Sequence, residues 1–425
     1  MTPERPDRTL LLTVTGRDRP GLTSALFDVL ADYPVEVLDI EQIVLRGRLI
    51  LGVLVTSPND EGELSARLTR TARALGVDLE TIAGTGDNAA RGAGRLHVTV
   101  LGQPLRPVAV AAMAGVIAAS GANIDRIVRL SRHPVTSLEL DVSGADSADL
   151  RRRLTEEAAR REVDVAVQKT GLYRRAKRLI VMDVDSTLIR GEMVEALGEL
   201  AGHADEIARI TDQAMHGELD FAASLRSRVA LLEGLDASAL DKVTKQVELM
   251  PGAATLIRTL KRLDHEVAIV SGGFTQITDG LVAELGLHYA AANTLEIVAG
   301  RLTGRLLEPI LDRAGKEAAM RRFATAAGVP LSQTVAIGDG ANDLDMIAAA
   351  GLGVAFNAKA VVKQAADASV SVPHLDAILY LLGISKAEMD EDDHDEHPAE
   401  DATDDPADPR ERKSPPMSGS RPWHS

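Results

Sequence analysis

The stretch that decides the fold of the second half of the chain is Leu179-Ile180-Val181-Met182-Asp183-Val184-Asp185-Ser186-Thr187. It begins with four apolar residues and ends in aspartate and hydroxyl residues, a pattern typical of a buried strand followed by a polar loop. Two later stretches have the same form, Val267-Ala268-Ile269-Val270-Ser271-Gly272-Gly273 and Thr334-Val335-Ala336-Ile337-Gly338-Asp339-Gly340-Ala341-Asn342-Asp343. Because amphipathic helical patterns alternate with these strands, the sequence predicts a parallel α/β sheet.

The polar loops after these strands predict a single site. Ligands of open parallel sheets bind beyond the carboxyl ends of the strands, so the three loops should face one crevice. The crevice would bring together the carboxylates of Asp183, Asp185, Asp339 and Asp343. Carboxylates this close repel one another unless a cation lies among them. Mg²⁺ fits best, since it is a hard cation that prefers oxygen ligands. Each stretch alone is equally typical of a turn or a helix cap; together they indicate a site.

The same stretches resemble the motifs of the haloacid dehalogenase superfamily and, within it, of the phosphoserine phosphatases. Residues 183–187 are similar to the first motif, Ser271 to the second, Lys316 to the third and residues 338–343 to the fourth. The resemblance covers roughly residues 177–384 and implies a three-layer, Rossmann-like domain. A helical pattern without a strand, at about residues 191–250, resembles the mobile helical cap of these enzymes, which excludes water once substrate is bound.

For catalysis, the resemblance implies hydrolysis of a phosphomonoester through an aspartyl phosphate. Asp183 would attack phosphorus, and Asp185 would protonate the leaving oxygen and then deprotonate water. Mg²⁺ would be held by the Asp183 carboxylate, the Asp185 carbonyl and Asp339, with Asp343 orienting its waters.

Other matched residues would bind the phosphoryl group. The Ser271 hydroxyl and the Gly272 N–H would contact its oxygens, because glycine allows the backbone to approach closely. Lys316 would neutralise charge that develops during transfer, and Asn342 would contact the substrate or the Asp183 region. From the residues alone, Lys316 is also typical of a solvated lysine at the start of a helix.

Four cap positions match the family pattern for a phosphorylated amino acid, with L-phosphoserine as the expected substrate. Glu192 would pair with its ammonium group and Arg228 with its carboxylate, while Met215 and Phe221 would supply apolar packing. From the residues alone, Glu192 is more typical of a first-turn acid favoured by the helix dipole. From the residues alone, Arg228 is likewise more typical of an exposed helix residue, and Met215 and Phe221 are more typical of the apolar core of a cap.

The first half of the chain contains a repeat. The strand pattern Leu10–Gly16 recurs at Leu96–Gly102, 86 residues later, and each copy continues with a helix, two strands, a helix and a strand. This period is too long for a solenoid and indicates two copies of a small α+β domain. Both copies resemble the ACT domain, a βαββαβ amino-acid-binding module.

The loop Thr15-Gly16-Arg17-Asp18-Arg19-Pro20-Gly21 carries the better signature of the two copies. Asp18 and Gly21 would help to bind a regulatory amino acid, with L-serine as the expected effector, although the same residues are typical of a turn before a helix. The second copy has Gln103-Pro104-Leu105-Arg106-Pro107 at this place, which departs from the family loop. Because such domains pair through sheet edges or helices, we expect a homodimer.

Composition limits the class of protein. The chain has 425 residues, no cysteine and a net charge of −16. The lack of cysteine excludes disulfides, thiolate metal sites and cysteine nucleophiles. No basic patch indicates nucleic acid or an anionic membrane, and no apolar run reaches the ~20 residues of a membrane helix, so we expect a cytoplasmic protein. From Glu388 to Ser425 there are 13 acidic and 4 basic residues without apolar periodicity, which is typical of a disordered tail.

The sequence thus predicts ACT-like domains at residues 1–90 and 91–172, a phosphatase domain at 173–388 and an acidic tail at 389–425. Together with the tandem repeat, the resemblance is to the long mycobacterial type of phosphoserine phosphatase. Rival functions are a phosphatase for another small phosphomonoester, or a phosphotransferase that uses an acceptor alcohol. A regulator with an inactive phosphatase domain is disfavoured, because every expected catalytic position holds a competent residue. A P-type ATPase fragment is excluded by the lack of membrane spans.

Overall fold

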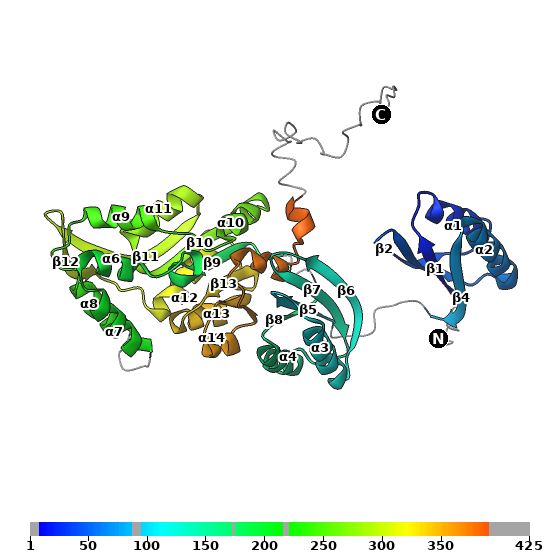
Figure 1. Ribbon diagram of the computed structural model, residues 1–425, viewed down its shortest axis with the longest axis horizontal. Coiled ribbons are helices and arrows are strands. Elements are labelled where there is room, and N and C mark those ends of the chain that lie inside the picture. Colours follow the sequence, from blue (N-terminus) through cyan, green and yellow to red (C-terminus); the bar gives the residue numbers. More distant parts are fainter. Residues whose placement is uncertain (1–7, 87–94, 172–173, 175, 216–220, 391–425) are drawn as a thin grey trace, which may run out of the picture. The chain divides into compact units, whose positions relative to one another are not determined.

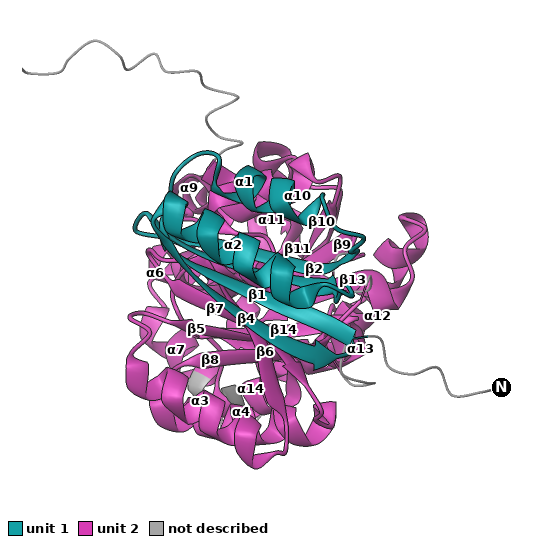
Figure 2. Cartoon of the chain, turned by 90° about the vertical axis from the view of Figure 1, so that its right-hand side faces the viewer, with its two compact units in different colours: residues 1–92 teal, residues 93–425 magenta. Residues whose placement is uncertain are grey.

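The computed structural model describes residues 8–86, 95–171, 174, 176–215 and 221–390. The chain divides into two compact units, residues 1–92 and 93–425 (Figures 1 and 2). Within the described residues, no helix is long and apolar enough to cross a membrane. The tail predicted at 389–425 lies outside this part of the chain, apart from its first two residues.

The first unit is a βαββαβ domain. Its elements are β1 (Arg8–Arg17), α1 (Leu22–Leu30), β2 (Val37–Leu45), β3 (Arg48–Thr56), α2 (Glu61–Leu75) and β4 (Val77–Thr85). The strands form an antiparallel sheet in the order β2-β3-β1-β4, with both helices on one face (Figure 2). Alternate residues of β1, namely Leu10, Leu12 and Val14, are buried in the core that this face shares with the helices.

The second repeat has the same order of elements and belongs to the second unit. It consists of β5 (Leu96–Gly102), α3 (Pro107–Ala119), β6 (Asn123–Ser131), β7 (Thr136–Ser143), α4 (Ser147–Arg161) and β8 (Asp164–Lys169). The predicted βαββαβ order is therefore confirmed in both copies.

The phosphatase sheet is built around β9 (Leu179–Asp183), which pairs in parallel with β10 (Glu266–Phe274) on one side and β13 (Thr334–Gly338) on the other. It continues through β14 (Leu352–Phe356) and β15 (Ala368–Val370) at one end. At the other end, β11 (Tyr289–Val298) pairs in parallel with β10, and β12 (Arg301–Leu307) forms an antiparallel hairpin with β11. The predicted α/β fold class is confirmed, with this antiparallel edge added.

Helices cover both faces of the phosphatase sheet. In β9, Ile180 and Met182 belong to a core shared with α10 (Ala253–Arg262) and α11 (Thr275–Leu285). The alternate residues Leu179 and Val181 pack on the opposite face, in a core shared with α12 (Arg313–Ala326), α13 (Leu344–Ala349) and α14 (Ala360–Ala365). A strand buried on both faces reads as one apolar run, which explains the stretch Leu179–Met182.

The second ACT-like repeat and the phosphatase domain share one sheet of eleven strands, in the order β12-β11-β10-β9-β13-β14-β15-β8-β5-β7-β6. The junction is a short antiparallel contact, in which Ala368 of β15 faces Ala166 of β8. Beside it, the buried Asp164 carboxylate accepts hydrogen bonds from the Ser371 N–H at 2.5 Å and the Ser371 hydroxyl at 2.7 Å. The two predicted domains are thus tied by backbone pairing and by a buried charge.

Four helices lie between β9 and β10 and form the cap: α6 (Met193–Ala201), α7 (Ala204–Met215), α8 (Phe221–Ala230) and α9 (Ser238–Gln246). The described part of this insertion contains no β-strand. Isolated pairs of β-type backbone hydrogen bonding join Ile189 to Leu249 and Asp236 to Arg301. The helical character predicted for residues 191–250 agrees with this arrangement.

Candidate active site

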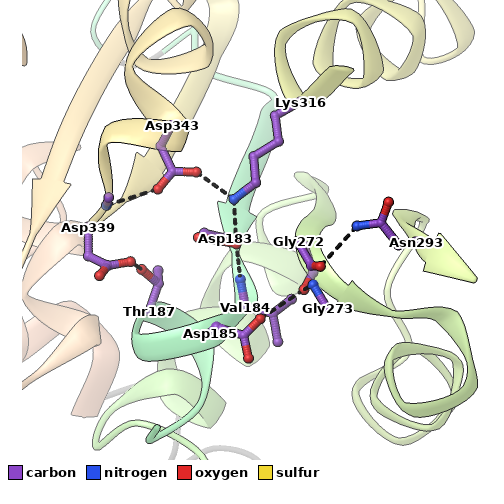
Figure 3. A network of polar contacts seen from close by, with 12 residues as sticks. Asp183, Val184, Asp185, Thr187, Gly272, Gly273, Asn293, Lys316, Asp339 and Asp343 are labelled. Carbon is purple, nitrogen blue, oxygen red and sulfur yellow. Dashed lines mark hydrogen bonds and ion pairs between the residues drawn. The ribbon is translucent and has the colours of Figure 1, made fainter. Parts of the chain in front are cut away.

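Asp183 is the last residue of the central strand. Its side chain is buried, and its Oδ1 accepts a hydrogen bond from the Val184 N–H at 2.8 Å. A tight turn, Val184–Leu188, follows, in which Ser186 has a left-handed φ of 59°. The backbone turn directs Asp185 toward β10 and the cap, where its carboxylate accepts hydrogen bonds from the Met193 N–H at 2.8 Å and the Ser271 hydroxyl at 3.1 Å. The two aspartates of one strand end thereby have different surroundings (Figure 3).

Asp183, Asp339 and Asp343 form what we call the acid cluster, because one carboxylate oxygen from each lies within 4.8 Å of the others. The fully buried Lys316, which α12 carries, lies against this cluster. Its Nζ is 2.9 Å from Asp183 Oδ1 and 2.7 Å from Asp343 Oδ1 (Figure 3). Burial lowers the pKa of Lys316, but the charges of Asp183 and Asp343 outweigh this and raise it above its usual value. Lys316 is therefore a permanent cation.

One lysine does not balance three carboxylates. Burial and the neighbouring charge of Asp343 raise the pKa of Asp183 well above its usual value, and the same two causes raise the pKa of Asp339 to about 7. A divalent cation among the three carboxylates would relieve this repulsion. The donors are all hard oxygen atoms, as Mg²⁺ prefers, so the acid cluster fits the predicted metal.

Asp185 has a pKa suited to proton transfer near neutral pH. Burial raises its pKa to about 6, while the hydrogen bond from the Met193 N–H acts in the opposite direction. General acids and bases work best when their pKa lies near the working pH. Asp185 can therefore hold or release a proton at the mouth of the acid cluster.

Gly338 lets Asp343 approach the end of β13. A Cβ atom at position 338 would lie 2.5 Å from Asp343 Cγ, which is closer than real Cβ contacts. Asp343 is thus packed directly under the strand end, where its Oδ2 accepts a hydrogen bond from the Gly340 N–H at 3.1 Å. Its Oδ1 faces Lys316, so Asp343 links the third and fourth motifs.

The cap contributes a charged pair. Glu192, directly before α6, has its Oε2 3.3 Å from Nη1 of Arg228 on α8. The Thr211 hydroxyl of α7 lies 3.4 Å from the same nitrogen, and the Arg228 Nε is buried with no hydrogen-bond partner among the described residues. A buried guanidinium with an unpaired N–H is a ready receptor for a carboxylate.

These groups surround one cavity of about 480 Å³ between the strand ends and the cap. Predicted residues that line it are Asp183, Asp185, Glu192, Phe221, Arg228, Gly272, Asp339 and Asn342. The side chains of Ser271, Lys316 and Asp343 are buried beneath its floor. Met215 is the last residue of α7, and its side chain lies outside the described part of the chain.

The two predicted regulatory residues lie in the first unit. The Asp18 N–H donates a hydrogen bond to the Gly47 carbonyl at 2.7 Å, and Gly21 has a φ of 90° directly before α1. This local geometry is that of a turn into a helix. The binding of an amino acid there stays a prediction.

Several residues at the site were not predicted from the sequence. Thr187 donates a hydrogen bond to Asp339 Oδ1 at 3.2 Å, and Thr211, Asn357 and Lys359 line the cavity. Asn293, on β11, contacts the backbone of Gly272. Thr187 is the last residue of the first motif, and its polar side chain could have been assigned to the site from the sequence. The others are single polar residues whose place at the cavity depends on the tertiary structure.

Comparisons with known proteins agree with this geometry. A model of haloacid dehalogenase-like hydrolases matches residues 180–348, and two ACT-domain models match residues 8–81 and 96–168. The chain is 60% identical over 384 residues to a phosphoserine phosphatase of Streptomyces coelicolor, which covers 90% of this chain and 94% of the relative. It is 52% identical over 386 residues to a phosphoserine phosphatase of Mycobacterium tuberculosis, with the same two coverages.

A solved structure also resembles the chain. The unliganded form of a probable phosphoserine phosphatase from Vibrio cholerae is 33% identical, with a TM-score of 0.54. The match covers 69% of this chain and 88% of that one. Because relatives of high identity are matched over nearly their whole length, the chain belongs to the phosphoserine phosphatase family of haloacid dehalogenase-like hydrolases, with two ACT domains ahead of the hydrolase domain.

Proposed function

We propose that this protein hydrolyses L-phosphoserine to L-serine and phosphate, the last step of serine biosynthesis, through an aspartyl phosphate on Asp183. One observation carries the proposal: a single cavity joins the acid cluster to the Glu192 and Arg228 pair. The first group suits a phosphoryl group, and the second suits the ammonium and carboxylate of an amino acid. The names of the relatives point to the same substrate.

In the first step, the Asp183 carboxylate attacks phosphorus, and an Asp183 O–P bond forms while the bond from phosphorus to the serine oxygen breaks. The contacts of Asp183 Oδ1 with Lys316 and with the Val184 N–H fix the rotation of the carboxylate for this attack. Asp185 gives its proton to the departing serine oxygen. The Ser271 hydroxyl and the Gly272 N–H hold the phosphoryl oxygens during transfer.

In the second step, Asp185 acts as a base. Now ionised, it removes a proton from a water molecule, which attacks phosphorus as the Asp183 O–P bond breaks. Inorganic phosphate leaves, Asp183 is again a carboxylate, and Asp185 is again protonated. A pKa of about 6 suits Asp185 to both proton transfers near neutral pH.

Asp183, Asp339 and the Asp185 carbonyl would hold Mg²⁺, with Asp343 beside them orienting bound water. When bound, Mg²⁺ would neutralise charge on the phosphoryl oxygens and on the Asp183 carboxylate. Lys316 supplies further positive charge on the side of the cluster that faces α12. The positive charges of Mg²⁺ and Lys316 would thereby let the anionic Asp183 carboxylate approach the anionic substrate.

At the other end of the cavity, Glu192 would bind the ammonium group and Arg228 the carboxylate, with Phe221 packing on the carbon chain. In the present structure these two charged side chains contact each other. Substrate binding replaces that contact with two ion pairs to the ligand. This arrangement favours an amino acid over a simple phosphate ester.

The test is phosphate release from L-phosphoserine, phosphoethanolamine and p-nitrophenyl phosphate, each with Mg²⁺ and with or without an acceptor alcohol. We expect L-phosphoserine to have the highest kcat/KM, and Arg228→Ala to lower it about 30-fold or more while changing p-nitrophenyl phosphate by less than about threefold. Arg226→Ala is the matched control, because Arg226 lies two residues away on α8 and pairs with Glu308 on the surface. Equal losses on all three esters would contradict the assigned role of Arg228.

We further propose that L-serine binds the first ACT domain at the loop of Asp18 and Gly21 and regulates the enzyme as a homodimer. Support comes from the ACT models that match both repeats and from the loop pattern at residues 15–21. Millimolar L-serine should change either the activity or the assembly state, measured by phosphate release and by sedimentation. The proposal fails if neither changes. The cytoplasmic location stays a prediction from the sequence.

A further inference from the structure

We infer that Asn293 is a positioning residue for the proposed reaction, because its single amide group holds both the phosphoryl-binding loop and the segment that leads to Lys316. Asn293 lies on β11 and is only 1% exposed. Its Nδ2 donates a hydrogen bond to the Gly272 carbonyl at 2.9 Å (Figure 3), and its Oδ1 accepts one from the Leu311 N–H at 2.7 Å.

The first contact compensates for an interruption of the sheet. β10 pairs with β11 at Val270 and Ala291 and again at Phe274 and Asn293. Between these pairs β10 has three residues, Ser271 to Gly273, whereas β11 has one, so the loop leaves the regular ladder. Asn293 supplies a side-chain hydrogen bond to the loop at the point where backbone pairing is lost.

This loop needs an external anchor because of its composition. Gly272 and Gly273 are adjacent, and glycine populates a wide range of backbone conformations. The Gly273 N–H donates to Ser271 Oγ at 2.8 Å, which closes the loop on itself but does not tie it to the sheet. The bond from Asn293 fixes the peptide group that joins Gly272 to Gly273, and this restrains the backbone of Gly272. The Gly272 N–H, which is proposed to bind a phosphoryl oxygen, is thereby held in place before substrate arrives, beside the Ser271 hydroxyl that donates to Asp185.

The second contact reaches the lysine helix. Leu311 precedes Asp312, whose side chain caps α12 by accepting a hydrogen bond from the Gly315 N–H at 2.8 Å. Lys316 follows in the first turn of this helix. Asn293 therefore sets the distance between the phosphoryl-binding loop and the helix that carries the charge-neutralising lysine. Errors of about 1 Å in such distances can lower turnover roughly 100-fold.

The inference rests on the proposed function, and the experiment separates the two. Asn293→Leu keeps a similar volume but removes both hydrogen bonds. The matched control is Gln276→Met, since the Gln276 amide also bridges backbone groups of β11, with its Nε2 2.9 Å from the Leu295 carbonyl, but does not contact the phosphoryl-binding loop. Both variants are compared with wild type by kcat and KM for L-phosphoserine, by thermal unfolding, and by calorimetric binding of orthovanadate with Mg²⁺.

We expect Asn293→Leu to lower kcat by about tenfold to 100-fold, with KM changed less than about threefold, and to weaken orthovanadate binding at least about tenfold. Gln276→Met should remain within about threefold of wild type in all three quantities. Because vanadate binding needs no turnover, it decides the inference even if L-phosphoserine is not the substrate. An inactive wild type that still binds vanadate would instead count against the proposed function.

Unchanged kcat and vanadate affinity in a folded Asn293→Leu variant would overturn the inference. If this variant does not fold, Asn293→Ala takes its place, because it removes the same bonds without adding bulk. If neither variant folds at 25 °C, Asn293 is a structural residue, and the inference is equally overturned.

Discussion

At the scale of single residues, the charges of the acid cluster favour the binding of a cation. Lys316 sets one positive charge against Asp183, Asp339 and Asp343. Burial first, and then the neighbouring charge of Asp343, raise the pKa values of Asp183 and Asp339. The chain alone does not neutralise the negative charge of this cluster. The cluster therefore lowers the stability of the fold until a positively charged ligand binds.

Metal removal tests this account of the acid cluster. Treatment with EDTA should abolish phosphate release, and added Mg²⁺ should restore it, since the anionic nucleophile and substrate repel each other without the cation. Thermal unfolding should shift in parallel, because a ligand at 100 times its Kd adds about 2.7 kcal/mol to the free energy of unfolding. In the Asp339→Asn variant, Mg²⁺ should restore little activity and should raise the unfolding temperature much less than in wild type. Full activity in EDTA would contradict the assignment of the cluster.

A second residue-scale prediction concerns Lys177, which the proposed mechanism does not use. Its Nζ donates a hydrogen bond to the Ser332 carbonyl at 2.6 Å, and burial lowers its pKa to about 8. Between about pH 8 and 10.5 the unfolded chain therefore binds more protons at this lysine than the folded chain does. Stability from this group rises with pH across that window, and its cost is present in full below pH 8.

The measurement is urea unfolding of wild type and Lys177→Met from pH 7.5 to 10.5. We expect the free energy of unfolding of wild type, relative to the variant, to rise by about 1–2 kcal/mol over this range, after allowance for solvent screening. Titrations elsewhere cancel in the difference. A difference that is constant with pH would show that the Lys177 ammonium has an ordinary pKa.

At the scale of elements, the apolar strands and their polar ends were predictable because both faces of the sheet are buried. The runs at residues 179–182, 267–270 and 334–337 lie in β9, β10 and β13, and polar loops at the ends of these runs meet at one cavity. The 86-residue repeat likewise predicted two βαββαβ units.

Other elements depended on contacts between distant segments. The sequence of β11 and β12 does not indicate that these strands form an antiparallel hairpin at the edge of the sheet. The role of Asn293 arises from a break in the pairing of β10 and β11, which only the folded register reveals. The contact of β15 with β8 is a single residue pair, too short to leave a pattern in sequence.

Glycine in two different elements gives a prediction at this scale. A Cβ on Gly353, in β14, would lie 2.4 Å from the Ile347 carbonyl oxygen, and this backbone atom cannot move aside easily. Gly115 is an exposed residue inside α3, where a Cβ would meet nothing within 4 Å. Gly353→Ala should therefore destabilise the protein by about 1–3 kcal/mol, whereas Gly115→Ala should stabilise it by about 0.5–1 kcal/mol. Urea unfolding measures the change in the free energy of unfolding for both variants. Changes of the same sign would contradict the different surroundings of the two glycines.

At the scale of the whole molecule, the second ACT domain is part of the same sheet as the phosphatase domain, whereas the first forms a separate compact unit. The junction includes buried groups from both sides. Asp164 receives hydrogen bonds from Ser369 and Ser371, and Arg174 donates hydrogen bonds to the carbonyls of Tyr380 and Leu381 at 3.1 Å. The second ACT domain is thus placed to affect the stability of the catalytic sheet.

Removing Asp164 tests this junction. Asp164→Ala leaves the Ser371 N–H and two hydroxyl groups without their acceptor, and each lost hydrogen bond to a charged group costs about 1.5–3 kcal/mol. We expect the free energy of unfolding to fall by at least about 2 kcal/mol, and proteolysis between residues 169 and 179 to become faster. Asp78→Ala, at an exposed position on β4, is the control and should stay within about 0.5 kcal/mol of wild type. Equal free energies of unfolding for the two variants would mean that the hydrogen bonds of Asp164 do not stabilise the junction.

The most direct test of the central proposal is phosphate release from L-phosphoserine with Mg²⁺ by wild type and by Asp183→Asn, with Asp279→Asn, an exposed residue of α11, as control. Because an amide cannot act as the nucleophile, Asp183→Asn should lose activity by at least about 1,000-fold, while wild type and the control hydrolyse L-phosphoserine at equal rates. An Asp183→Asn variant that retains a substantial fraction of wild-type turnover would contradict an aspartyl phosphate on Asp183.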